Sequence, residues 1–140
     1  VEAGNMARHY REAPLNAIWE GAGNIMALDV LRAISRDPHV LDAVLETIGK
    51  DLDGDNTSKL VDVIRSASEM VADDPGSARI LVEQLAFTAA AAELQRQGVS
   101  GITGAFLETR LGGLWRNTYG MLDNRYDCKA LINAGFPAFA

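Results

Sequence analysis

Residues 8–32 read RHYREAPLNAIWEGAGNIMALDVLR and contain the clearest secondary-structure signals of the chain. Pro14 should end a first helix over residues 2–12, because the residue before a proline avoids the α region. After an irregular connector, apolar residues recur at helical spacing from Ala22 to Ile34. The stretch therefore predicts two helices, joined by a turn that carries a single carboxylate, Glu20.

The rest of the chain continues the helical pattern, and no clustered alternation of Thr and Val predicts a strand. Further helices are expected over residues 40–48, 57–72, 75–97, 102–108 and 126–134. Gly49 marks the expected end of the helix over residues 40–48. The Asp74-Pro75 step marks the expected start of the helix over residues 75–97, and Gly98 its end. The predicted fold is all-α, an antiparallel helical bundle with short connections.

Two of the predicted helices carry apolar residues at the spacing of an amphipathic stripe. One stripe consists of Leu60, Val63, Ile64, Ala67 and Val71, and the other of Leu81, Val82, Leu85, Ala89 and Ala92. Core burial is the commoner use of such a stripe. The second stripe could instead serve an interface between copies of the chain.

Composition narrows the class of protein. The chain has 140 residues, 48% of them hydrophobic, which is typical of a folded domain with a core. A net charge of −6 opposes binding to nucleic acid. The single cysteine, Cys128, cannot form an internal disulfide, and neither a signal peptide nor an apolar run of about 18 residues is found. We expect a cytoplasmic protein that does not enter the membrane.

The start of the chain predicts a fragment. It begins with Val1 rather than Met, and in the middle of a pattern without a capping signal. We therefore expect the C-terminal part of a longer protein, whose function depends on more than this piece.

Glu20 has a purely structural interpretation. A carboxylate just ahead of a helix interacts favourably with the helix N-terminus by about 0.3–1 kcal/mol. Trp19 would then be a core or edge aromatic residue, and Gly21 and Gly23 would be turn residues. Without further information this interpretation is the stronger one.

A motif around Glu20 favours a second interpretation. It consists of Tyr10, Arg11, Glu12, Ile18, Trp19, Glu20, Gly21 and Ala22. This pattern resembles that of the acyl-CoA dehydrogenases, flavin enzymes that desaturate acyl thioesters, which reads Tyr-Arg-Asp and then Ile-Tyr-Glu-Gly-Thr before a helix. Ala22 replaces a Thr or Ser that commonly touches the flavin in that family. WEGAGN with DVLR, and FLETRLGGLWRNTYG at residues 106–120, are most similar to the alkylation-response branch.

The resemblance implies roles for five residues. Glu20 would be the catalytic base that removes the α-proton, and its N–H would donate to the thioester carbonyl. Gly21 would line the acyl-CoA substrate, and Ala22, Gly23 and Asn24 would contact FAD, the hydride acceptor. A carboxylate suits this task when a dry pocket raises its pKa towards neutral.

The resemblance also implies a domain organisation. Residues 1–36 would be the terminal helices of a dehydrogenase core, and residues 37–140 an appended helical domain. The parent would be a homo-oligomer, and the fragment alone is expected to bind no FAD and to be inactive. The alternative is a helical module for binding DNA or a protein partner, or for oligomerisation, beside a degenerate flavin site.

A metal site is not expected. The DLDGDN segment at residues 51–56 begins like an EF-hand loop, with carboxylates at alternate positions. However, Asn56 stands where the loop needs a glycine, and Asp62 where it needs a glutamate. A solvated turn explains the segment better.

Overall fold

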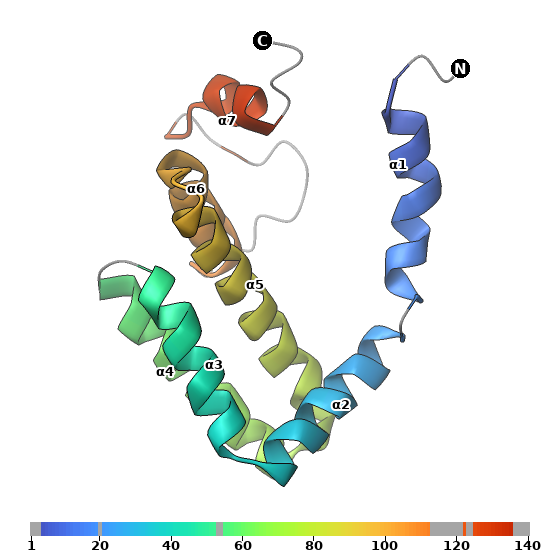
Figure 1. Ribbon diagram of the computed structural model, residues 1–140, viewed down its shortest axis with the longest axis vertical. Coiled ribbons are helices and arrows are strands. Elements are labelled where there is room, and N and C mark those ends of the chain that lie inside the picture. The colour runs from blue at the N-terminus through green and yellow to red at the C-terminus, as the bar shows by residue number, and fades with distance from the viewer. Residues whose placement is uncertain (1–3, 20, 53–54, 113–121, 123–124, 136–140) are drawn as a thin grey trace.

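The computed structural model describes residues 4–19, 21–52, 55–112, 122 and 125–135 (only the backbone at 55, 56 and 100). Every regular element within these ranges is a helix, which confirms the predicted all-α fold (Figure 1). The α-helices are α1 (Met6–Glu12), α2 (Gly23–Arg36), α3 (His39–Asp51), α4 (Asp55–Asp73), α5 (Ala78–Arg96), α6 (Ser100–Arg110) and α7 (Cys128–Gly135), and the 3₁₀ helices are η1 (Ala13–Ala17) and η2 (Pro75–Ser77).

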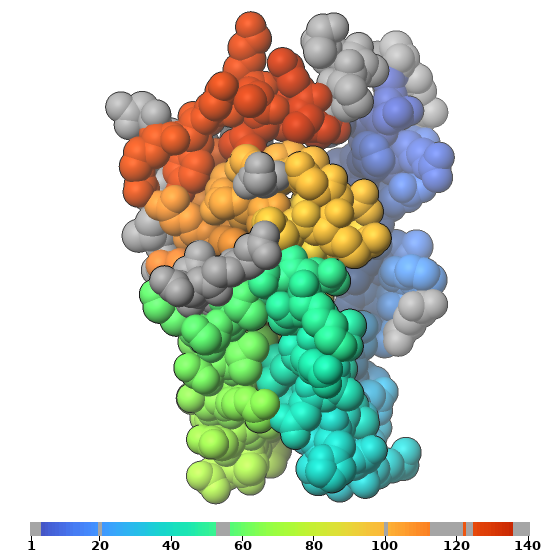
Figure 2. All heavy atoms as spheres, turned by 60° about the vertical axis from the view of Figure 1, so that its left-hand side comes forward, coloured from blue at the N-terminus to red at the C-terminus, as the bar shows by residue number. Residues whose placement is uncertain are grey.

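Helix α5 is the centre of the bundle. It contacts α2, α3, α4 and α6, and α4 and α5 form an up-and-down pair joined by η2. Helix α2 crosses one end of α5, while α1 and η1 extend away from the bundle (Figure 1). Helices α6 and α7 lie beyond one end of the α3–α4 pair (Figure 2).

Two apolar clusters form the core. The larger one joins α2 to α5 and consists of Ala27, Leu41, Leu45, Ile64, Ala67, Val71, Ala78 and Leu81. The second lies where α5 meets α3 and α6, and consists of Ile48, Leu52, Ala91 and Ala92. In the second cluster region, the rings of Phe87 and Phe106 meet edge to face with centroids 6.0 Å apart, a favourable geometry for aromatic pairs.

The Asp74-Pro75 step starts a helical segment as predicted. Asp74 has an extended backbone, and its Oδ1 accepts a hydrogen bond of 2.9 Å from the N–H of Gly76. Pro75 occupies the first helical position, where its missing N–H costs nothing. The first turn is the 3₁₀ helix η2, and α5 continues from it.

Gly98 ends α5 as predicted. Its φ of +74° lies in the left-handed region, which L side chains rarely adopt. The N–H of Val99 donates to the carbonyl of Leu94 (3.3 Å), and the N–H of Gly98 donates to that of Gln95 (2.9 Å). These two bonds define a Schellman motif, which satisfies carbonyls at the helix end.

The predicted end of α3 at Gly49 is wrong. The helix runs through the glycine to Asp51, and α4 begins already at Asp55. Thr57, the first residue of the predicted helix over residues 57–72, lies inside α4, and its hydroxyl donates to the carbonyl of Leu52 at 2.9 Å. The hydroxyl therefore satisfies the end of α3 rather than the start of α4. The connector before α2 also differs from expectation, because its first part is the 3₁₀ helix η1.

The predicted apolar faces are only partly buried. In α2, Leu31 and Ile34 pack against the core, but Ile25 and Leu28 are exposed and Ala27 is buried in their place. Two residues of the predicted stripes, Val63 in α4 and Ala89 in α5, are exposed as well. An apolar repeat of helical spacing allows either of two adjacent helix faces to be buried, and the packing against α5 determines which one is.

The proposed division at residues 36 and 37 coincides with the break between α2 and α3. There, Asp37 accepts a hydrogen bond of 3.0 Å from the N–H of His39. Helix α2 nevertheless packs into the same core as α3, α4 and α5. The two-domain organisation stays a prediction.

Candidate functional site

The predicted site lies in the turn between η1 and α2. Glu20, the predicted catalytic base, lies outside the described residues, so its role stays a prediction. On one side of it, Trp19 donates its backbone N–H to the carbonyl of Leu15 at 3.0 Å. On the other side, Gly21 donates to the carbonyl of Ile18 at 3.4 Å.

Gly21 and Ala22 set the direction in which the chain enters α2. Gly21 has a φ of +124°, where any side chain would be strained. Ala22 follows with an extended backbone and is the N-cap of α2. Its carbonyl accepts the N–H groups of Ile25 (2.8 Å) and Met26 (3.2 Å). A glycine is therefore required at 21 by the backbone itself, whatever binds there.

The three predicted cofactor residues lie together and are exposed. Ala22 caps α2, and Gly23 and Asn24 begin its first turn. The first N–H groups of a helix have no partner within it, and together they carry a partial positive charge. The N-cap residue Ala22 makes no side-chain cap hydrogen bond, and the first turn of α2 contains no acidic residue. The turn therefore presents amide donors to an anion.

Arg79 is a component of this region that the sequence analysis missed. It comes from the first turn of α5, and its Nη2 lies 3.8 Å from the position that a Cβ on Gly23 would occupy. The packing of α2 across α5 creates this proximity. No local signal could have revealed it, because the two residues belong to different helices.

Apolar side chains surround the turn. Ile18 (68%), Trp19 (54%), Ile25 (53%) and Met26 (50%) are all largely exposed. Helix α1 and η1 contribute no buried residue, and this segment forms one edge of the molecule (Figure 2). A shallow hollow of about 400 Å³ lies along it, lined by His9, Glu12, Ala13, Leu15, Asn16 and Trp19. Contiguous exposed apolar surface is typical of a face that contacts another molecule or domain.

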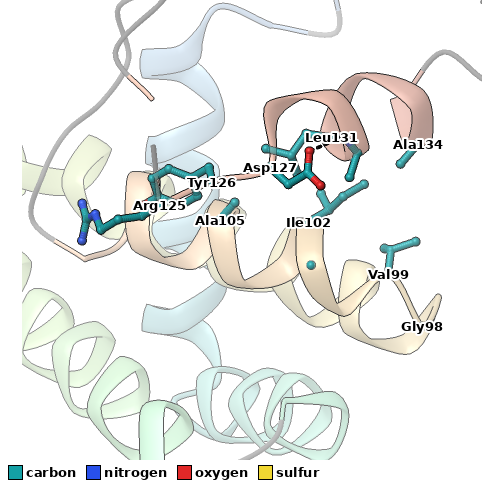
Figure 3. A pocket seen from close by; sticks show the side chains of 11 residues that line it. Gly98, Val99, Ile102, Ala105, Arg125, Tyr126, Asp127, Leu131 and Ala134 are labelled. Carbon is teal, nitrogen blue, oxygen red and sulfur yellow. Dashed lines mark hydrogen bonds between the residues drawn. The ribbon is translucent and has the colours of Figure 1, made fainter. Parts of the chain in front are cut away.

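A second hollow of about 470 Å³ lies between α6 and α7 (Figure 3). Two of its polar side chains already have structural roles. Arg125 forms an ion pair of 2.8 Å with Glu108. Asp127 accepts a hydrogen bond of 2.9 Å from the N–H of Ala130 and so caps α7. The remaining lining is mainly apolar and gives no arrangement of groups for catalysis.

Within the described ranges, no three His, Cys, Asp or Glu side chains are grouped closely enough to hold a metal ion. Asp51 and Asp55 of the EF-hand-like segment belong to different helices, while Asp53 lies outside the described residues. Among the described helices, none is both long and apolar enough to cross a membrane.

Comparison with known proteins gives one informative match. No protein-family model matches the chain. Over 54 residues, however, the chain is 48% identical to AidB, an acyl-CoA dehydrogenase-like protein of Escherichia coli (strain K12). The match covers 36% of this chain and 10% of AidB, so the chain spans about a tenth of that relative's length. It confirms the resemblance to the acyl-CoA dehydrogenase family and to the AidB-like branch over the matched segment.

Proposed function

We propose that this chain is the C-terminal helical part of an FAD-dependent acyl-CoA dehydrogenase, inactive by itself. In the complete protein, the Glu20 carboxylate accepts the α-proton of an acyl-CoA thioester. The hydride leaves from the β-carbon, and a double bond forms between the two carbons. FAD supplies the hydride acceptor for this reaction. The observation that carries the proposal is the match to AidB, together with the exposed turn that flanks Glu20.

Glu20 and Gly21 have different roles in this reaction. Glu20 holds the proton, and its N–H donates to the thioester carbonyl, on which negative charge develops as the proton leaves. Gly21, without a side chain, lets the substrate approach the backbone. These roles come from the family resemblance.

The residues at the start of α2 fit an anionic cofactor. The donor set consists of backbone N–H groups of Gly23 and Asn24 at the positive end of a helix, which suits the diphosphate of FAD. Ala22 cannot donate a side-chain hydrogen bond, so the backbone must supply the contacts that a Thr or Ser would add. The exposed apolar side chains of η1 and α2 suit contact with further parts of the protein, or with a second copy in a homo-oligomer.

A second function is favoured by one observation. The apolar edge formed by α1 and η1 is compatible with a helical module that binds a protein partner or oligomerises, beside a flavin site weakened by Ala22. The net charge of −6 opposes a nucleic acid as the partner. A flavoprotein that binds FAD but is not reduced by any acyl-CoA would favour this alternative.

The test uses the full-length protein that contains this segment. Its bound flavin is mixed with a panel of acyl-CoA thioesters, and the loss of flavin absorbance is followed in the wild type and in Glu20→Gln. A positioned general base contributes about 10²–10⁴-fold to rate, so Glu20→Gln should reduce the flavin at least about 100 times more slowly. Glu83→Gln, on an exposed face of α5, is the matched control and should react at the wild-type rate. Equal rates in Glu20→Gln and the wild type would refute the assignment.

A further inference from the structure

The outer side of α4 carries large apolar side chains that are exposed. Val63 and Met70 are 48% and 51% exposed, and they lie two turns apart on one face of the helix. Val63 also lines a hollow of about 460 Å³ between α4 and α6. Leu60 and Leu107 line the same hollow and pack against the second core cluster. Val63 and Met70 therefore extend an apolar groove, called here the α4–α6 groove, whose base is held by the core.

Acidic side chains border this groove along α4. Asp62, Glu69 and Asp73 are exposed, and their spacing of seven and four residues places them on one face, next to Val63 and Met70. Each of α1, α2, α3, α5 and α6 has an acidic side chain in an ion pair, but within the described residues no ion pair includes any of these three. The border therefore carries negative charge that the chain itself leaves unbalanced.

The two ends of the groove differ in charge. Lys59 lines it at the α6 end. Glu108 lines the same end, but its charge is balanced by Arg125 at 2.8 Å. From Lys59 to Met70 the groove follows α4 for about 16 Å, the length of three helical turns. A helix bound antiparallel to α4 would place its positive N-terminus near the acidic border and its negative C-terminus near Lys59.

We propose that the α4–α6 groove binds a basic amphipathic helix of another protein, about three turns long. The apolar side chains of that helix contact Val63, Met70 and Leu107, and its Lys or Arg side chains pair with the acidic border. A second copy of the chain fits less well, because a two-fold contact through this groove brings the same acidic border together twice. Nucleic acid and anionic lipid are opposed by the same border and by the net charge of −6. The groove lies across α5 from α1 and does not depend on the role of Glu20 (Figure 1).

The first experiment titrates the chain, labelled for amide NMR, with a synthetic peptide of about 14 residues that has leucines on one helical face and lysines beside them. The amide resonances of Val63, Met70 and Leu107 should shift saturably. The control is the same peptide with glutamates in place of the lysines. It should bind at least about tenfold more weakly at low salt, because its charges meet a border of the same sign.

Two matched pairs of variants test the two kinds of contact, and all four side chains are exposed, so the fold should be unaffected. Val63→Ser removes apolar contact and should raise the dissociation constant of the lysine peptide about fivefold. Its control is Val44→Ser on α3, where the side chain is 40% exposed, and it should leave the constant unchanged. Glu69→Gln should raise the constant about threefold at low salt and reduce its salt dependence. Glu83→Gln, which removes the same charge outside the groove, should do neither.

Three results would overturn the proposal. The first is an absence of saturable shifts at the groove, or shifts confined to α1 and η1. The second is equal binding of the lysine and glutamate peptides, or equal constants within each matched pair of variants. The third is a concentration-dependent dimer in sedimentation that Val63→Ser abolishes, because the groove would then bind a second copy. None of these measurements involves flavin or Glu20, so the failure of this inference is distinguishable from the failure of the proposed function.

Discussion

Leu81 offers a direct test of the packing that brings α2 to α5. Its side chain is fully buried, in the cluster that contains Ala27 of α2, Leu41 and Leu45 of α3, and Ile64 of α4. Replacement by alanine removes its buried atoms and leaves a cavity. Such changes cost about 2.7–5.0 kcal/mol in well-packed cores. The partly buried neighbours Val82 and Leu85 can move inwards, so we expect a loss of about 3 kcal/mol, near the lower end.

The measurement is equilibrium unfolding in urea, followed by far-ultraviolet circular dichroism. With a urea dependence of about 2 kcal/mol per M, a loss of about 3 kcal/mol lowers the midpoint by about 1.5 M. Ile80→Ala is the matched control, because Ile80 is the preceding residue of α5 and is 49% exposed. It should cost less than about 1 kcal/mol, since it removes little buried surface and alanine favours the helix.

The test compares the loss of stability in Leu81→Ala with that in Ile80→Ala. Equal losses for Leu81→Ala and Ile80→Ala, or a loss below about 1 kcal/mol for the former, would mean that α5 does not present the face described here to α2, α3 and α4. The deduction that α5 positions Arg79 beside Gly23 would then fail with it.

Three further predictions concern the turns and one ion pair. Gly98→Ala should destabilise the chain by about 1 kcal/mol because φ is +74° there. Gly104 lies inside α6 with open space around it, so Gly104→Ala should stabilise the chain by up to about 1 kcal/mol. Thermal unfolding measures both changes. Gly21→Ala should cost about 1–2 kcal/mol, since φ is +124°, and thermal unfolding that matches the wild type would contradict the strain at this turn. The hydrogen bond from Arg96 lowers the pKa of Glu93 from 4.5 to about 2. A carboxylate whose pKa is lower in the folded state than in the unfolded state stabilises the fold above about pH 4.5. This contribution is lost as the pH falls towards about 2. Glu93→Gln should therefore flatten the pH dependence of stability in that window, and an unchanged profile would contradict the pairing.

Local signals in the sequence predicted most of the helices correctly. Asp74 and Gly98 act through their own backbone and side chain within a few residues, so their effects can be read without knowledge of the fold. Gly49 was misleading because a glycine permits a helix end but does not require one, and the α3 helix continues through it. Thr57, at the predicted start of the next helix, donates its hydroxyl to the carbonyl of Leu52 at the end of α3.

The candidate site, too, could be predicted only in part from the sequence. The motif around Glu20 and the glycines that follow it can be recognised in the sequence, because the chemistry depends on a short contiguous segment. Whether the residues of this segment face a partner or the core could not be predicted. The exposure of Trp19 and Ile25, for example, depends on which elements pack beside the turn.

The sequence alone determined the helical class, the main helix ends and the family resemblance, because periodicity, capping and motif spacing are properties of neighbouring residues. Only the tertiary structure decided which face of α2 is buried and that Arg79 lies beside Gly23. The physical reason is that packing is a competition between faces of several helices, and its outcome depends on distant residues that no local pattern specifies.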